Sequence, residues 1–212
     1  MESKELQKEK QRNMLYEKIC DFLSTRKIAM VSVFLFLLMI IPVLLLTFYN
    51  RASGDDYGYG VWVRTALRQS DSFIGVLRAA AEAVISVYDG WQGTWSSVFL
   101  FALQPEAFSD KAYVITTLLM FVLLTGAIMW FFFDFLYKKM FFDKEYYGII
   151  LILFLVNTIM FVPSTKSALY WYNGTIHYTL PFVLCLVLSV IVFRYVEDYK
   201  FGQYAIILLI MI

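Results

Sequence analysis

Long apolar stretches alternate with short polar ones along most of the chain. An α-helix needs about 20 consecutive apolar residues to cross the hydrocarbon core of a bilayer. The pattern therefore predicts membrane-spanning helices at 28–49, 112–137, 146–162, 178–196 and 201–212. The last of these stretches stops in mid-span, so we expect the chain to be the N-terminal portion of a longer protein. The predicted fold class is an all-α, polytopic transmembrane protein.

The distribution of Lys and Arg predicts how these helices are oriented. Residues 1–27 are rich in Lys and Glu, and Lys18, Arg26 and Lys27 come just before the first apolar stretch. Positively charged loops remain on the cytoplasmic side of a membrane. We expect a cytoplasmic N-terminal segment over 1–27 that forms an amphipathic helix near the membrane surface. A transmembrane domain over 28–212 then follows in the cytoplasmic (plasma) membrane.

The long polar segment 50–111 is expected on the outer side, as the first outer loop. Ser72 to Tyr88 has the periodicity of an amphipathic helix, and Ser70 or Ser72 is suited to cap its start. A shorter apolar piece covers 96–103 and ends before Pro105. We expect both pieces to be helices that lie along the outer membrane surface. The predicted apolar stripe of the first one consists of Phe73, Ile74, Leu77, Ala81, Val84, Ile85 and Tyr88.

Composition narrows the classes of function. Hydrophobic residues make up 60% of the chain and the net charge is +1, so we expect membrane lipids as partners and no nucleic acid. His177 is the single histidine, and Cys20 and Cys185 lie in unlike surroundings. These counts argue against a histidine-rich metal site and against a nucleophile that is assisted by histidine.

Two adjacent carboxylates, Asp55 and Asp56, follow the first predicted span and are framed by glycines. One interpretation is a solvated turn in which an aspartate caps the next helix. A second is a general base whose pKa is raised beside apolar walls. A third is a pair of oxygen ligands for a divalent cation. Neighbouring residues on an extended segment point in opposite directions, so the two carboxylates need not face one pocket.

Two aromatic motifs are expected on the same side as this pair. Trp91-Gln92-Gly93-Thr94-Trp95 joins the two short helices, and 169–178 includes Trp171, Asn173 and His177. Aromatic rings there either bind sugar rings or anchor the protein among lipid headgroups. Asn173-Gly174-Thr175 also matches the short pattern for N-glycosylation. The coincidence of the acidic pair and both motifs on one side favours a ligand site.

These features together resemble the C-type fold of polytopic glycosyltransferases. That fold has a cytoplasmic N-terminus and a long first outer loop, with an acidic motif just after the first span. The chain is also similar to a family of uncharacterised bacterial membrane proteins related to that fold. The similarity lies in Gly54-Asp55-Asp56-Tyr57, in Trp91-Gln92-Gly93 and in 171–178. Thr94 departs from the arginine that this similarity would lead us to expect.

The resemblance implies transfer of a sugar from a polyprenyl-phosphate donor to a cell-envelope glycan or lipid acceptor. Asp55 would be the general base, and Asp56 would orient the acceptor or assist with a metal. No cofactor is expected, because many members of the fold work without a metal, although a divalent cation at Asp55 and Asp56 remains an alternative. The candidate substrate-binding residues are Arg51, Tyr57, Tyr59, Arg64, Trp91, Gln92, Lys166, Trp171, Asn173 and His177.

Two other functions remain open from the sequence, namely a transporter or flippase of a lipid-linked saccharide and a non-enzymatic membrane scaffold. Transporters place ionisable residues within their spans. Here Asp134 and Arg194 lie close to the inner ends of their spans, where we expect them to snorkel towards water. This position favours the glycosyltransferase over the transporter.

Overall fold

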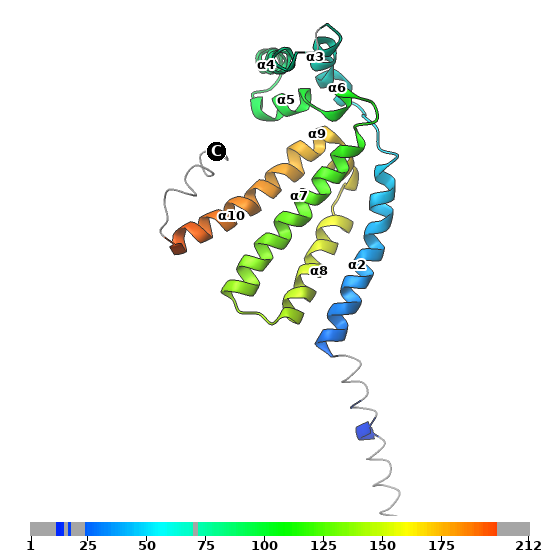
Figure 1. The fold of residues 1–212 in the computed structure, drawn as a ribbon, viewed down its shortest axis with the longest axis vertical. Coiled ribbons are helices and arrows are strands. Elements are labelled where there is room, and N and C mark those ends of the chain that lie inside the picture. Colours follow the sequence, from blue (N-terminus) through cyan, green and yellow to red (C-terminus); the bar gives the residue numbers. More distant parts are fainter. Residues whose placement is uncertain (1–11, 15–16, 18–23, 70–71, 199–212) are drawn as a thin grey trace, which may run out of the picture.

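The computed structural model describes residues 12–14, 17, 24–69 and 72–198, and every regular element within them is helical (Figure 1). This confirms the all-α prediction. The predicted span over 201–212 and most of the segment 1–27 lie outside the described residues. The helices are α2 (Thr25–Thr47), α3 (Asp56–Gln69), α4 (Phe73–Gly90), α5 (Trp95–Ala102), α6 (Pro105–Phe108), α7 (Val114–Phe132), η1 (Phe133–Lys139), α8 (Lys144–Met160), η2 (Lys166–Tyr170), α9 (Tyr172–Gly174), η3 (Thr175–Thr179) and α10 (Leu180–Asp198).

Three continuous helical stretches are long and apolar enough to cross a membrane. They cover Thr25–Thr47, Val114–Lys139 and Tyr172–Val196, and the last two join α7 to η1 and α9 through η3 to α10. They match the predicted spans over 28–49, 112–137 and 178–196, although the last one begins several residues earlier than its apolar stretch. These helices are typical of a membrane protein.

Helix α8 covers most of the span predicted over 146–162. It is a helix of 17 residues, which corresponds to about 26 Å of length. This is shorter than the three stretches above and close to the lower limit of about 17 residues for a spanning helix, so the span over 146–162 stays a prediction. It packs against α2 and α7 (Figure 1), and the chain bends directly after it, before Pro163.

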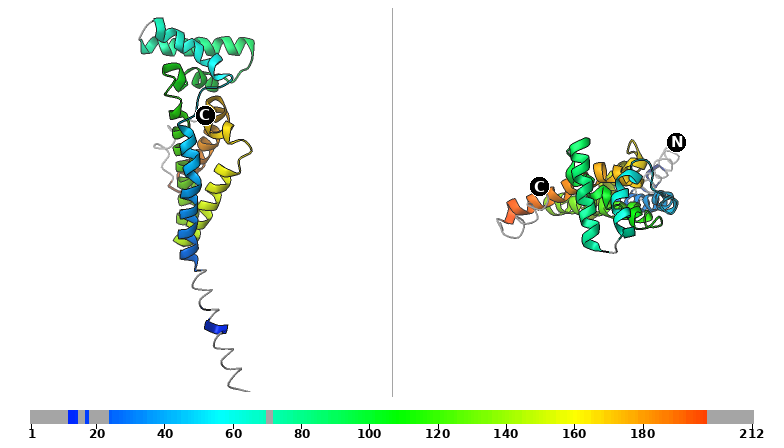
Figure 2. Two further views of the ribbon diagram at one scale, coloured as in Figure 1. Left: turned by 90° about the vertical axis from the view of Figure 1, so that its right-hand side faces the viewer. Right: turned by 90° about the horizontal axis from the view of Figure 1, so that it is seen from above.

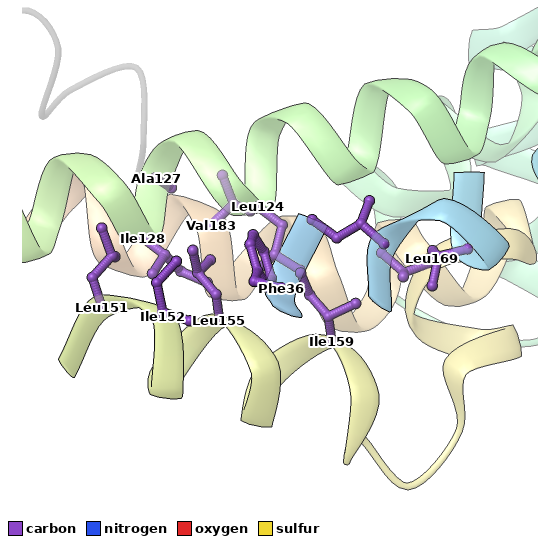
Figure 3. Close-up of a cluster of buried hydrophobic side chains, with 12 residues drawn as sticks. Phe36, Leu124, Ala127, Ile128, Leu151, Ile152, Leu155, Ile159, Leu169 and Val183 are labelled. Atoms are coloured by element: carbon purple, nitrogen blue, oxygen red, sulfur yellow. The ribbon is translucent and has the colours of Figure 1, made fainter. Parts of the chain in front are cut away.

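Apolar side chains fill the space between these helices (Figure 3). Phe36 of α2 and Leu124 of α7 lie in one buried cluster with Leu155 and Ile159 of α8 and with Val183 of α10. Only 17% of the most apolar part of α2 is buried inside the protein. The remaining apolar surface of α2 faces away from the protein, as expected for a helix whose solvent is lipid.

The end of the bundle that is farther from α3 carries an ion pair in which the carboxylate is buried and the guanidinium is partly exposed. Asp134 of η1 is 3% exposed and receives two hydrogen bonds from the Arg194 guanidinium, one of them 2.8 Å long. Lys138 adds a contact of 3.2 Å. The prediction that Asp134 snorkels towards water is therefore wrong, because its bidentate partner lies on the neighbouring helix α10.

Helices α3 to α6 (Asp56–Phe108), which we call the α3–α6 layer, lie across one end of the bundle (Figure 2). Helix α4 runs crosswise to the long helices, and α5 lies between α4 and the ends of α7 and α10 (Figure 1). A second apolar cluster holds the layer together, with Val63 of α3, Ala80 of α4 and Ala102 of α5 all fully buried. The α3–α6 layer is thus held together by its own apolar core, which fixes the positions of the residues on its surface.

The predicted amphipathic helix is present as α4, and the Ser72 hydroxyl accepts a capping bond from the Gly75 amide at 3.5 Å. Its packing face differs from the prediction. The buried residues are Val76, Ala79, Ala80 and Ala83. Most of the predicted stripe is exposed instead, including Ile74, which is 77% exposed. Small side chains let α3 and α5 approach closely, so the alanine-rich face packs and the bulkier one stays outside.

Candidate functional site

A tight turn separates the two adjacent carboxylates. Gly54 has a φ of +61°, a left-handed conformation that glycine adopts without steric cost. The Asp55 carbonyl then accepts the hydrogen bond from the Tyr59 amide at 3.1 Å, while Asp56 is the first residue of α3. The Asp55 side chain is exposed and the Asp56 side chain is fully buried. The pair therefore does not act as one unit.

Asp56 is the junction of three segments that are distant in sequence. Its carboxylate accepts hydrogen bonds from the Tyr113 hydroxyl, from the Ser53 amide at 3.0 Å and from the Asn173 amide at 3.4 Å. The Tyr113 hydroxyl in turn accepts a bond from the Tyr172 amide at 2.8 Å. These bonds tie the start of α3 to the start of α7 and to α9.

Burial sets the protonation behaviour of this junction. It raises the pKa of Asp56 above the usual range, although the hydrogen bonds from Tyr113, Ser53 and Asn173 oppose that effect. Burial also raises the pKa of Tyr113, and its hydrogen bond to Asp56 adds to the increase. Tyr113 consequently stays neutral and acts as a donor to the carboxylate.

A close approach of α3 to the residues before α6 completes the junction. The Gln104 side-chain amide donates to the Asp56 carbonyl. It lies so close to Gly60 that a Cβ there would come within 2.5 Å of the Gln104 nitrogen. Gly60 therefore has a packing role, and Asp56 is anchored through its backbone as well as its side chain.

The Asp55 carboxylate lines a cavity of about 390 Å³ between α3 and the end of α4. We call this cavity the Asp55 groove, and its lining residues are Asp55, Gly58, Tyr59, Trp62, Val87 and Trp91. Three of the six are aromatic, and among these lining residues Asp55 is the only charged one. The groove is thus an aromatic surface with one hydrogen-bond-accepting carboxylate.

Further contacts hold the inner wall of the groove. The Gln92 side chain donates to the Tyr59 hydroxyl at 3.4 Å. The Tyr59 ring packs on Phe101 with centroids 5.0 Å apart, and Phe101 meets the His177 ring edge-on at 4.8 Å. Burial raises the pKa of Tyr59, with a smaller contribution from the charge of Asp55. A short series of rings therefore connects the groove to His177.

His177 lines a second cavity, of about 450 Å³, between α5 and the start of α10. We call it the His177 cavity; it is lined by Gly93, Thr94, Trp95, Ser96, Ser97, Leu100, Ile176, His177, Leu180, Pro181 and Leu184. Trp91 lines the Asp55 groove and Gly93 lines the His177 cavity. One short segment after α4 thus separates the two cavities.

The three basic residues predicted to bind substrate are not brought together at the groove. The Arg64 guanidinium forms an ion pair with Glu106, which is buried in α6. The Arg51 guanidinium donates to the Phe48 and Asn50 carbonyls, the latter at 2.7 Å. Lys166 is exposed at the start of η2. None of the three lines the groove.

The remaining predicted residues divide between surface and interior. Tyr57 is exposed beside Asp56, whereas Trp171 is half-buried. Asn173 is 3% exposed, so its side chain is not presented for glycosylation. Among the residues that the structure describes, its side-chain amide and the Trp171 indole nitrogen have no hydrogen-bond partner.

Gly174 lies at a close contact between α9 and η2. A Cβ on Gly174 would lie 2.6 Å from the Ser167 carbonyl oxygen and 2.8 Å from the Trp171 ring. Only glycine therefore lets α9 pack against η2, and this packing brings the Asn173 amide to Asp56.

Several residues of the site were not singled out from the sequence. Trp62 lies three residues after Tyr59 and four after Gly58, which places all three on one face of a helix. That spacing was a usable signal. Tyr113 and Gln104 gave none, because their partners are distant in sequence and are decided by packing.

Comparison of the chain with protein-family models, with curated proteins and with solved structures found no match. Within the residues that the structure describes, no group of three or more His, Cys, Asp or Glu side chains is arranged to hold a metal ion. The Asp55 groove and the His177 cavity are therefore the features that point to a function.

Proposed function

We propose that the protein is an integral-membrane glycosyltransferase of the cytoplasmic membrane. It transfers a sugar from a polyprenyl-phosphate donor to a cell-envelope glycan or lipid acceptor. One observation carries the proposal: Asp55 is exposed in an aromatic groove, while the adjacent Asp56 is withdrawn into the protein. A general base must be reachable by its substrate, and of the two carboxylates Asp55 meets that condition.

In the proposed reaction an acceptor hydroxyl lies in the groove within hydrogen-bond distance of the Asp55 carboxylate. The acceptor oxygen attacks the anomeric carbon of the donor sugar as its proton passes to Asp55. The bond between that carbon and the phosphate oxygen breaks, and polyprenyl phosphate leaves with the electron pair. Asp56 has a positioning role here, because it fixes the start of α3 directly beside the base.

The lipid part of the donor is assigned to the His177 cavity. Leu180 and Leu184 of α10 supply an apolar wall, and α10 belongs to a stretch long enough to span a membrane. Ser96 and His177 supply polar groups at the same cavity. A phosphate carried on an apolar chain needs such a combination of surfaces. The donor sugar would then reach past the short segment after α4 to the Asp55 groove, where the acceptor hydroxyl lies.

The proposed topology has the N-terminus inside and the α3–α6 layer on the outer face. In support, Lys138 and Lys144 flank the turn between η1 and α8, at the end of the bundle far from the layer (Figure 1). Short loops rich in Lys and Arg remain on the cytoplasmic side. Both cavities would therefore open on the outer side of the membrane.

The test is the variant Asp55→Asn, which keeps the size of the side chain and removes its basicity. Transfer from a labelled polyprenyl-phosphate sugar to membrane acceptors is measured with the full protein in membranes. General-base catalysis contributes about 10²- to 10⁴-fold, so turnover should fall by that factor at unchanged expression. Asp89→Asn, at an exposed aspartate of α4, is the matched control. Wild-type turnover in Asp55→Asn would refute the assignment of the base.

A further inference from the structure

We propose that the Asp55 groove is the acceptor subsite and that it takes an uncharged sugar unit, packed against Trp62 and Trp91. Sugars that carry phosphate or carboxylate groups are excluded from it. The term acceptor rests on the proposed function. The preference for an uncharged ring rests on the residues of the groove itself.

Two indole rings from different elements line the groove. Trp62 projects from α3 and is 37% exposed, and Trp91 follows α4 and is 82% exposed. The Trp91 amide donates to the Val87 carbonyl at 2.8 Å, which fixes the backbone that carries the ring. Exposed rings that line one groove form flat apolar surfaces, and the C–H faces of a sugar ring are complementary to such surfaces.

Open space lies beside the Asp55 carboxylate, over Gly58. Gly58 lines the groove, and a Cβ at this position would meet no atom within 4 Å. The surface next to Asp55 is therefore bare backbone with open space above it. A volume of about 390 Å³ lies within the range of roughly 300–1,000 Å³ that small-molecule sites occupy. It is sufficient for one or two sugar units.

The lining of the groove carries a negative charge and no positive one. Asp55 is the only charged residue among those that line the groove. Of the basic residues predicted to bind substrate, Arg64 pairs with Glu106 and Arg51 donates to two backbone carbonyls, and neither lines the groove. A phosphate or carboxylate in the groove would face Asp55 without a compensating positive charge, and two like charges at short distance repel strongly. A sugar hydroxyl, by contrast, donates to that carboxylate.

Binding of soluble oligosaccharides to the full protein, purified in a detergent without a sugar headgroup, tests this inference. The uncharged probes are cellohexaose, maltohexaose and chitohexaose, and the anionic probe is a galacturonate hexamer. At least one uncharged probe should bind, and the anionic probe should bind at least tenfold more weakly. Trp62→Ala and Trp91→Ala should each raise the Kd of the uncharged probe about tenfold, which corresponds to about 1.4 kcal/mol. Trp130→Phe, at the opposite end of α7, should leave the Kd unchanged.

A second variant removes the dependence on aromatic substitutions. Gly58→Leu adds a side chain that enters the groove while both tryptophans stay in place, and it should abolish binding of the uncharged probe. The inference is overturned by equal or tighter binding of the anionic hexamer. Unchanged affinity in Trp62→Ala, Trp91→Ala and Gly58→Leu also overturns it, and so does the failure of every uncharged probe to bind.

The outcomes of the two tests are separable. Asp55→Asn should keep the affinity for the uncharged probe within a few-fold while transfer is lost, since an amide oxygen still accepts a hydrogen bond from a hydroxyl. Retained transfer in that variant contradicts the proposed function alone. Absence of sugar binding in the wild-type protein contradicts the acceptor subsite alone, even where transfer is measured.

Discussion

Replacement of Tyr113 by phenylalanine tests whether the buried junction at Asp56 holds the α3–α6 layer on the bundle. The substitution keeps the ring in its fully buried position and removes only the hydroxyl. That hydroxyl donates to the Asp56 carboxylate and accepts from the Tyr172 amide. Its loss removes one of the three donors to the Asp56 carboxylate and leaves the buried Tyr172 amide without this acceptor.

The cost follows from these two bonds. A hydrogen bond to a charged group contributes about 1.5–3 kcal/mol, and a buried donor left unsatisfied costs about 1–3 kcal/mol. The two terms share one atom and are not additive, so we expect a net loss of about 3 kcal/mol in the stability of the junction. Since 1.4 kcal/mol is a tenfold change in an equilibrium constant, local opening should increase roughly a hundredfold.

Amide hydrogen exchange measures this opening where it should occur. The amides of Ser53, Tyr172 and Asn173 donate directly to the junction, and peptides that contain them should exchange faster in Tyr113→Phe. Peptides from the middle of α8 should keep their wild-type rates, because its core contacts lie within the bundle. Tyr88→Phe is the control, because the Tyr88 side chain is 61% exposed on α4.

Wild-type exchange at these three amides in Tyr113→Phe would refute the reasoning. It would mean that Gln104 and the apolar contacts hold the start of α3 without help from the Asp56 carboxylate. Faster exchange spread evenly over all helices would also refute it, because the junction would then have no separate local opening.

Two further predictions concern the same region. Burial raises the pKa of Asp56, so the folded state binds the proton of this carboxyl group more tightly than the unfolded state does. The stability that the protonated group contributes is therefore lost as the pH rises from about 4, the pKa of an aspartate in the unfolded chain. Asp56→Asn should flatten this decline in chemical unfolding across pH, whereas a decline as steep as in the wild type would contradict the effect. Gly174→Ala should reduce the thermal stability of the purified protein, because the added Cβ meets the Ser167 backbone. Gly148→Ala should leave the melting temperature unchanged, because a Cβ there meets no atom within 4 Å. Equal melting temperatures for the two variants would contradict the packing role of Gly174.

The local sequence pattern was sufficient to predict an element wherever the residues of that one segment determine its structure. The spans around α2, α7 and α10 followed from uninterrupted apolar length, and α4 followed from its periodicity and from Ser72 as cap. The face on which α4 packs did not follow. Its hydrophobic residues cover more than one side, and the choice of the alanine side depends on how closely α3 and α5 approach.

Asp55 and Asp56 show most clearly which properties follow from the sequence and which follow from the tertiary structure. Sequence alone determined that an acidic pair follows the first span, in a glycine-rich turn, near aromatic motifs that belong to one end of the molecule. It did not determine which carboxylate is accessible, since two neighbouring residues are chemically identical in isolation. Tertiary structure decided that Tyr113 and the Asn173 amide bury Asp56 and leave Asp55 in the groove. The physical reason is that a carboxylate is buried only where distant segments bring enough donors to replace water, and no local pattern records those donors.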